Sequence, residues 1–132
     1  MNRISVRTRN RNDMVDITQD VRSAVRSSGV REGICTVFVP HTTAGVTINE
    51  HADPDVASDM IHALDTLVPW DDSYAHVEGN SAAHVKCTLT GSSVTVIIED
   101  GEPQLGTWQG IFFCEYDGPR NRQVWISLVE SS

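Results

Sequence analysis

The sequence predicts an α+β fold, a single compact domain in which two helices pack on a largely antiparallel β-sheet or sandwich. Three observations predict this class. Apolar residues recur at helical spacing in two segments of the first half of the chain. The second half consists of strand-like runs that are separated by turn residues. The length of 132 residues suits one domain, so we expect residues 1–132 to fold as a unit.

Strand and helix signals alternate in the first third of the chain. Arg3–Asn10 alternates apolar and polar residues, as an edge strand does. Thr18 fits a helix N-cap and Gly29 fits a left-handed C-cap. These caps predict a helix over Gln19–Ser28. The apolar run Gly33–Val39 then predicts a buried strand.

A second helix is predicted after Asp53, which is a good N-cap with Pro54 at the first helical position. Its apolar stripe lies within Val56–Leu64. Val68–Asn80 follows as a long loop that holds aromatic residues, which is typical of functional loops rather than of disorder. Two histidines near this helix are interpreted as solvated: His51 and His62.

The second half is predicted to be all β. His84–Thr90 alternates as a strand does, after a short helical turn over Ser81–Ala83. Gly91 and Ser92 form a hairpin turn signal. Further strands are predicted over Val94–Ile98, Thr107–Tyr116 and Gln123–Val129.

Composition excludes several classes of protein. The net charge of −8 argues against nucleic-acid binding, which needs a basic face. No apolar stretch has the length of a membrane span, and the first ten residues lack the apolar core of a signal peptide. The three cysteines are widely spaced and lie in strand-like runs, as reduced, buried thiols do. We therefore expect a cytoplasmic protein without a membrane or nucleic-acid partner.

Three stretches are unusually polar for their setting. The first follows the predicted buried strand and contains His41, Thr42, Thr43, Asn49 and Glu50. The second lies in and after the long loop and contains His76, Glu78, Asn80 and His84. The third precedes a strand and contains Gly106, Thr107, Trp108 and Gln109. Polar groups that a rigid strand holds at its end are typical of sites.

The histidines and carboxylates of the first two stretches have more than one interpretation. As metal ligands, His41, His76 and His84 suit Zn²⁺, whereas Glu50 and Glu78 suit Mg²⁺. The same residues suit general acid–base chemistry near neutral pH. Their spacing matches no metalloprotease motif, so histidines that only satisfy local hydrogen bonds remain a further interpretation.

The third stretch also has two interpretations. Gly106 permits close backbone approach and Trp108 fills a core, which needs no function. Alternatively, Gly106–Gln109 is a set of donors for an anionic or aromatic ligand. The backbone N–H groups near Asn80 similarly suit a phosphate at the start of the helical turn.

Long motifs in this sequence resemble the YjbQ-like family, in order and over almost the whole chain. They are Val39–Glu50, Ala52–Val56, His76–His84, Leu105–Ile111 and Phe113–Arg120. The resemblance implies a single α+β domain that assembles as a homotrimer. It also implies a secondary thiamine-phosphate synthase, which joins a hydroxymethylpyrimidine diphosphate to a thiazole phosphate and releases diphosphate.

This chemistry gives the candidate residues roles with a small phosphorylated substrate. We expect catalytic roles for His41, Thr42, Thr43, Asn49, Glu50, Glu78 and His84. We expect substrate binding by Asn80, Gly106, Thr107, Trp108, Gln109 and Arg120. A leaving diphosphate needs positive charge, which Arg120 and a divalent ion, Zn²⁺ or Mg²⁺, would supply.

Two alternatives remain open from the residues. One is a metal-dependent hydrolase in which Glu50 or Glu78 acts as the base on a metal-activated water. The other is a non-catalytic trimer that binds a small anion or a metal ion in the same pocket.

Overall fold

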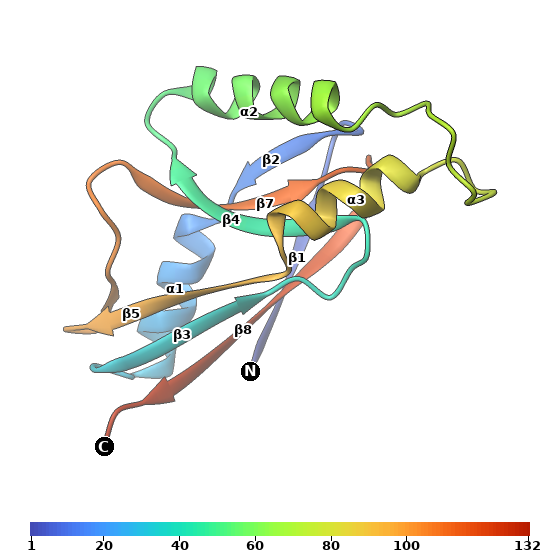
Figure 1. Ribbon diagram of the computed structural model, residues 1–132. Helices are drawn as coiled ribbons and strands as arrows, with labels where there is room; N and C mark the ends of the chain where they lie inside the picture. Colours follow the sequence, from blue (N-terminus) through green and yellow to red (C-terminus); the bar gives the residue numbers. More distant parts are fainter.

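Two antiparallel sheets and three helices make up the fold of residues 1–132, described here by a computed structural model (Figure 1). The strands are β1 Asn2–Arg7, β2 Asp13–Asp16, β3 Gly33–Phe38, β4 Ala44–Glu50, β5 Ser93–Glu99, β6 Glu102–Pro103, β7 Gln109–Glu115 and β8 Asn121–Glu130. The helices are α1 Thr18–Ser28, α2 Pro54–Leu67 and α3 Ser81–Thr90. The larger sheet has the order β1-β8-β3-β5-β6 and the smaller sheet the order β2-β7-β4. The predicted α+β class is therefore confirmed.

The helix ends follow from their capping residues. The Asp53 carboxylate accepts a hydrogen bond from the Asp55 N–H at 2.9 Å, with Pro54 at the first position of α2. Gly29 ends α1 with a left-handed φ of 73°, as its position in the sequence predicts. The prediction of Thr18 as the N-cap was wrong by one residue, because Thr18 is the first helical residue and the cap position falls on Ile17, which has no side-chain cap bond.

The prediction of two helices was wrong, because a third helix, α3, replaces the strand expected over His84–Thr90. The apolar residues that alternate in this stretch lie on the surface, and Val85 and Leu89 are 41% and 61% exposed. The buried residues of α3 recur at helical spacing instead: Ala82, Ala83 and Lys86. The alternation that predicted a strand thus comes from exposed side chains, so it does not indicate which face of this segment is buried.

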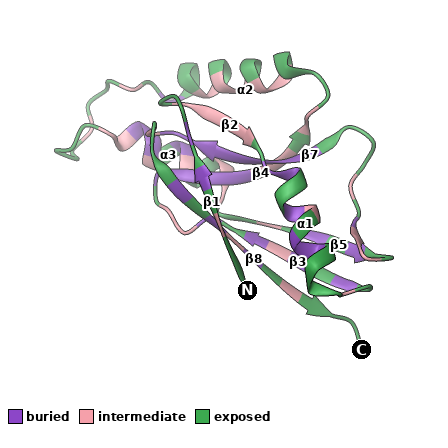
Figure 2. Cartoon of the chain, turned by 180° about the vertical axis from the view of Figure 1, so that it is seen from behind, coloured by how far each residue is buried: buried purple, intermediate pink, exposed green.

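The main core lies where α1 and the inner faces of both sheets meet. It includes Val21 and Val25 of α1, Val37 of β3, and Ile111 and Phe113 of β7, all fully buried. Figure 2 shows that the buried residues concentrate on β4, β7 and the central strands of the larger sheet. The opposite face of the larger sheet has no helix over it, and its exposed apolar residues are Ile34, Phe38, Ile97 and Val129. No helix of the chain is long and apolar enough to cross a membrane.

Helix α2 lies over the smaller sheet without contributing a single buried residue (Figure 2). A polar cluster attaches it to the rest of the fold. The side chain of Lys86, on α3, is 0% exposed, and its ammonium donates to the carboxylate of Asp65 on α2. Asn12 completes the cluster, since its amide oxygen accepts from Lys86 at 3.3 Å and its amide nitrogen donates to Asp65 at 3.1 Å.

Removing the Asp65 carboxylate leaves a buried ammonium without its counter-ion. We expect Asp65→Ala to lower the free energy of unfolding by about 3 kcal/mol, the lower end for a broken buried pair because Asp65 itself is half exposed. Asp59→Ala, an exposed position on the same helix, is the control. Lys86→Met removes the ammonium together with its need for a counter-ion, so it should lower the free energy of unfolding by less than Asp65→Ala does. Urea denaturation followed by circular dichroism measures this, and equal stability of the Asp65→Ala and Asp59→Ala proteins would contradict it.

Candidate functional site

An open pocket of about 440 Å³ lies where the ends of β3 and β8 meet the loop between β3 and β4. We call it the His41 pocket. Its lining combines apolar and polar residues: Phe38, Val39, Pro40, His41, Thr42, Ser92 and Arg122. The first polar stretch of the sequence therefore contributes two of its candidates, His41 and Thr42, to a common hollow, and Thr43 lies buried directly behind them.

The positive charge of this pocket comes from Arg122, which the sequence did not single out. Its side chain is 8% exposed, and it forms an ion pair with Glu115, which is 0% exposed. The Nε group donates to Glu115 Oε1 at 2.8 Å, and Nη2 donates to Glu115 Oε2 and to Thr43 Oγ1. Nη1 donates to no protein acceptor, so the N–H groups of this one guanidinium nitrogen are available to a ligand.

Glu115 is held as a carboxylate by five donors. Besides Arg122, the Thr8 hydroxyl donates to Oε1 at 2.8 Å, and the N–H groups of Tyr116 and Asp117 each donate to Oε2 at 3.1 Å. Burial alone would raise the pKa of Glu115, but the bonds from Arg122, Thr8 and Asp117 outweigh it and lower the pKa. The Glu115 carboxylate therefore stays ionised and holds the Arg122 guanidinium in place in the pocket.

His41 is a neutral hydrogen-bond donor in this setting. Its Nε2 accepts the Gln123 N–H at 2.9 Å, so the proton of the neutral ring lies on Nδ1. Burial, and then the charge of Arg122, lower the pKa of His41 below its usual value, although Glu115 opposes them. The N–H groups of His41 and Thr42 also donate to no protein acceptor. The groups left available in the pocket are thus mostly donors, which suits an anion.

The second polar stretch forms its own group on the first turn of α3 and the loop before it. The rings of His76 and His84 lie edge to face with 5.4 Å between their centroids. His76 Nε2 also lies 3.8 Å from Glu78 Oε2. The structure gathers no three or more His, Cys, Asp or Glu side chains into a set that could hold a metal ion. Within one chain His76 and His84 are neighbours and His41 does not join them, so the metal site stays a prediction.

Asp117 connects this second group to the His41 pocket. Its carboxylate accepts from Asn80 Nδ2 at 3.0 Å and from Arg120 Nη2 at 2.9 Å, and its N–H donates to Glu115. Asn80 Oδ1 is buried and has no hydrogen-bond partner in the chain. Arg120 thus bonds to Asp117 through Nε and Nη2 and does not line the His41 pocket, whereas Arg122 does.

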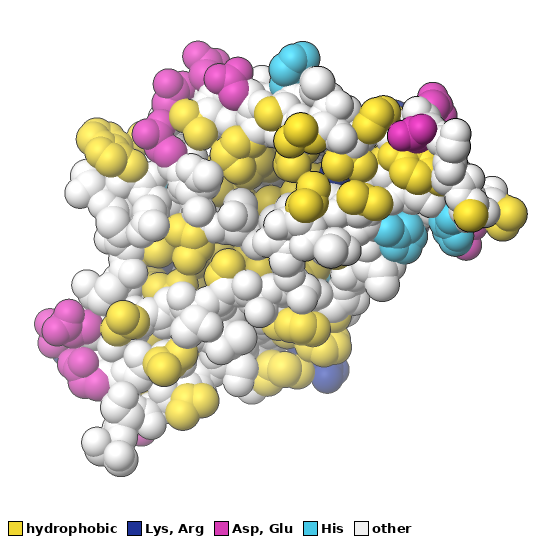
Figure 3. Space-filling view, in the orientation of Figure 1, with side chains coloured by type: hydrophobic (Ala, Val, Ile, Leu, Met, Phe, Trp, Pro, Cys, Tyr) yellow, Lys and Arg dark blue, Asp and Glu magenta, His cyan; other side chains and the backbone are white.

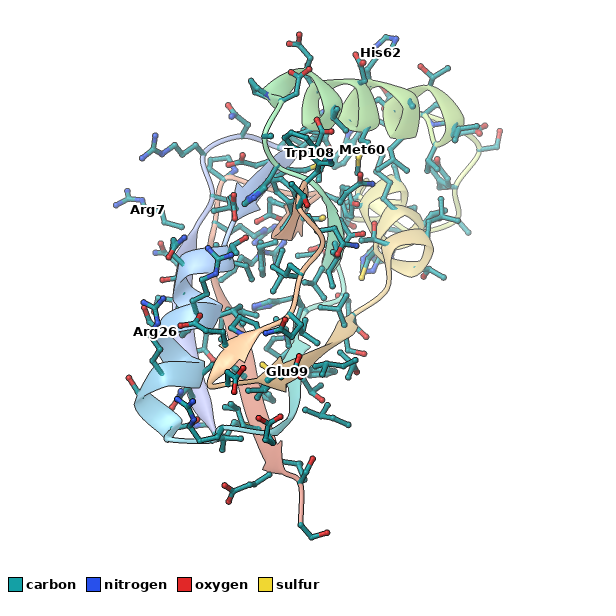
Figure 4. All side chains as sticks on the ribbon, turned by 90° about the vertical axis from the view of Figure 1, so that its left-hand side faces the viewer. Arg7, Arg26, Met60, His62, Glu99 and Trp108 are labelled. Atoms are coloured by element: carbon teal, nitrogen blue, oxygen red, sulfur yellow. The ribbon has the colours of Figure 1, made fainter.

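The third stretch lies at the far end of the smaller sheet. Glu50 pairs with Gln109 at one end of β4 and β7, whereas Ala44 pairs with Glu115 at the other. Seven residues of extended strand span about 20 Å. Asn49, Glu50, Gly106, Thr107, Trp108 and Gln109 are therefore separated from the His41 pocket within one chain. Figure 4 shows Trp108 below α2, and its side chain is largely exposed.

The interpretation of His51 as solvated was wrong. Its Nδ1 lies 2.8 Å from the Asp16 carboxylate, and its backbone N–H donates to the Trp108 carbonyl at 3.0 Å. The ring also occupies the space beside Gly110, where a Cβ would lie 2.4 Å from it. His51 therefore anchors the entry to α2, whereas His62 points away from the molecule (Figure 4).

The family follows from comparison with known proteins. A family profile described as UPF0047 protein YjbQ-like matches residues 2–131. The chain belongs to this YjbQ-like UPF0047 family. A UPF0047 protein of Methanocaldococcus jannaschii is 52% identical to it, over 94% of this chain and 90% of the relative. The UPF0047 protein YugU of Bacillus subtilis is 46% identical, over 96% of both chains.

Solved structures of UPF0047 proteins have the same fold. An uncharacterized YjbQ/UPF0047 protein of Clostridium acetobutylicum superposes with a TM-score of 0.96 at 52% identity, covering 98% of this chain and 100% of that chain. A YbjQ-like protein of unknown function from Sulfolobus solfataricus gives a TM-score of 0.95 at 32% identity, covering 98% of this chain and 96% of that chain. The resemblance in the sequence is confirmed for family and fold.

The sequence of this UPF0047 chain does contain a signal for Glu115 and Arg122, two site residues that lie outside the three polar stretches. Val124 and Ile126 occupy inward positions of β8, and the same period of two puts Arg122 on the inward face. Glu115 similarly ends β7 in a run that is buried from Gly110 onward. A charge at an inward strand position requires a buried partner, and these two residues are each other's partner.

The setting of His41 is open to direct measurement. We expect a pKa below 6.5 and the Nδ1–H tautomer at neutral pH, in a ¹⁵N NMR titration. Since the folded-state pKa is depressed, acidification through 6.5 should destabilise the fold until His41 itself is protonated. Arg122→Gln should move the pKa upward, because it removes a nearby positive charge. An Nε2–H tautomer, or a pKa above 6.5, would be the contrary result.

Proposed function

We propose that this UPF0047 protein binds a small phosphorylated substrate in the His41 pocket and acts as a thiamine-phosphate synthase-like transferase. The observation that supports it is the free Nη1 group of Arg122 in a pocket lined by His41 and Thr42. Charged N–H donors of this kind form strong hydrogen bonds with phosphate oxygens. The three free thiols fit a reducing cytoplasm, which we include in the proposal.

The proposed reaction breaks the bond between a pyrimidine methylene and its diphosphate, which leaves with the electron pair, and forms a bond to the thiazole. Negative charge grows on the leaving oxygen, and donors fixed in advance lower the barrier. Arg122 supplies a fixed cation, and neutral His41 supplies an Nδ1–H donor. Thr42 and the free N–H groups of the loop add further donors.

The same proposal includes a divalent ion, Zn²⁺ or Mg²⁺, which His76, Glu78 and His84 would hold. The donor types fit such an ion, because imidazole suits Zn²⁺ and carboxylate suits Mg²⁺. One chain supplies only two adjacent imidazoles and a carboxylate on a loop. We therefore assign the reaction steps to the residues of the His41 pocket alone.

Loss of the free guanidinium group tests the transferase. With hydroxymethylpyrimidine diphosphate and thiazole phosphate as substrates, we expect Arg122→Gln and His41→Ala each to reduce product formation by about 100-fold or more. Arg120→Gln is the matched control and should retain activity, because Arg120 does not line the His41 pocket. Arg122→Gln leaves the buried Glu115 carboxylate without its counter-ion, which destabilises the fold. The double variant Arg122→Gln/Glu115→Gln removes both charges, so we expect it to fold and to lack the cation.

Binding of inorganic diphosphate, measured by calorimetry, separates the alternatives. A wild-type protein that binds diphosphate through Arg122 but joins no precursors would be an anion-binding protein. Hydrolysis of the diphosphate precursor that depends on added metal and on Glu78 would favour the hydrolase. Activity that survives in both Arg122→Gln and His41→Ala would contradict the site.

We also propose a homotrimer, and the open face of the larger sheet supports it. Ile34 pairs with Ile97 on one side and with Val129 on the other, which forms an exposed apolar row across three strands. A second row places Phe38 against Trp125, with ring centroids 5.8 Å apart. Exposed apolar rows of this kind mark protein interfaces. Phe38 also lines the His41 pocket, so a neighbouring copy on this face would border the site.

Light scattering after size exclusion should give three times the chain mass of 14.5 kDa. Ile97→Asp buries a charge in the proposed interface, so we expect the trimer to dissociate. Leu67→Asp changes an equally exposed apolar residue on α2 and is expected to leave the mass unchanged. A monomeric wild-type protein would remove the trimer from the proposal.

A further inference from the structure

A second hollow, of about 330 Å³, lies between α2 and α3 above the smaller sheet. Figure 3 shows apolar side chains gathered in a depression between these two helices. The lining is mainly hydrophobic and includes Met14 of β2, Met60 and Leu64 of α2, and Leu89 of α3. None of its lining residues belongs to the His41 pocket. We call it the α2–α3 hollow.

The hollow exists because α2 does not close onto the sheet. Met60 points from α2 toward the sheet (Figure 4), and Met60, Ala63 and Leu64 all line the hollow. Yet no residue of α2 is buried by the rest of the chain. The polar cluster at Lys86 and Asp65 holds α2 in this position over the smaller sheet. Leu64 packs against the small core cluster of Ala83, Phe112, Cys114 and Tyr116, whereas Met60 and Ala63 face space that the chain itself does not fill.

The hydroxyl groups of Thr90 and Tyr116, which both line the hollow, are hydrogen-bonded to each other, and either can be the donor. Thr90 also lies 3.1 Å from the Lys86 carbonyl. A phenol oxygen has more than one lone pair, so the oxygen of Tyr116 can accept a further hydrogen bond whichever way that bond runs. Burial raises the pKa of this phenol, which keeps it protonated. The Thr47 hydroxyl, also in the lining, has no partner in the chain.

The lining carries no charge. It contains no Asp, Glu, Lys, Arg or His, and burial raises the pKa of the Cys114 thiol to about 12. A buried ion without a partner is strongly unfavourable, so a charged occupant is excluded. The outer positions of α2 also carry exposed aspartates and no Lys or Arg, which repels anions: Asp55 and Asp59. The phosphorylated substrate proposed for the His41 pocket therefore does not suit the hollow.

We propose that the α2–α3 hollow is a binding site for an uncharged, mainly apolar molecule of about two fused rings that carries one N–H or O–H donor. The size follows from volume, since a dry apolar cavity of about 150 Å³ holds benzene and this hollow has about twice that volume. The donor would bond to the Tyr116 oxygen. Met14 and Met60 are flexible thioethers that adapt to a flat ring and contact its edge favourably.

Indole and 1-methylindole are the probes, because they differ by the single N–H donor. Calorimetry on the wild-type full chain should show saturable binding of both, with indole tighter by about fivefold, the value of one hydrogen bond. Tyr116→Phe removes the acceptor and should abolish this preference while binding persists. Ala63→Phe fills the hollow and should weaken both probes by more than about tenfold. Ala52→Phe, just before α2 and outside the lining, is the matched control and should bind as the wild type does.

The contrary outcomes are equally definite. Absence of saturable binding by either probe would overturn the proposal, as would equal effects of Ala63→Phe and Ala52→Phe. Light scattering on the same samples identifies another occupant, since a mass that falls only in Ala63→Phe would show that a second copy of the chain fills the hollow. Retention of the indole preference in Tyr116→Phe would overturn Tyr116 as the acceptor, because the unpartnered Thr47 hydroxyl of the lining would then accept the bond. Diphosphate binding at the His41 pocket is independent of all these variants, so failure here leaves the proposed function untouched.

Discussion

The ion pair between Glu115 and Arg122 is the constraint on which the candidate site depends. Both charges are buried, so each is tolerable only because the other lies within hydrogen-bond distance. Glu115 ends β7 in the smaller sheet and Arg122 lies on β8 in the larger sheet. The pair thus joins the two sheets at one point, and Thr8 and Thr43 bond to it from two further segments. The same bonds that hold the sheets together place a cation in the pocket.

This arrangement explains how hydrogen bonds hold the side chains of the pocket in place. Every acceptor on the Glu115 carboxylate is used internally, and the free Nη1 group of Arg122 is left for a ligand. The His41 ring is held by the backbone N–H of Gln123, the residue after Arg122 on β8, which donates to Nε2. Helix α2, in contrast, is held by a polar cluster at one turn and by the partly buried Leu64, with no fully buried apolar side chain. Preorganised donors and an adaptable apolar hollow therefore occupy different layers of one small domain.

The sequence predicted those elements whose buried face sets the pattern. The helices α1 and α2 and the long strands follow from periodicity and caps, with ends that differ by a few residues, as for β1, which stops at Arg7. Helix α3 was missed because its exposed Val85 and Leu89 imitate a strand. The candidate residues were grouped by closeness in sequence, and β4 carries Asn49 and Glu50 away from His41 along an extended strand. Arg122 was missed because charge at an inward position has meaning only once its partner Glu115 is known.

The separation of the polar stretches limits how they can act together. Asn49, Glu50 and the Gly106–Gln109 loop lie about 20 Å along β4 and β7 from the His41 pocket. Paired strands of a sheet are rigid, so no loop movement within one chain closes this distance. The larger sheet meanwhile leaves apolar rows open beside that pocket, at Phe38 and Trp125. If all three stretches act on one substrate, residues from two copies must therefore face each other, and the unit of function is then the assembly and not the single chain.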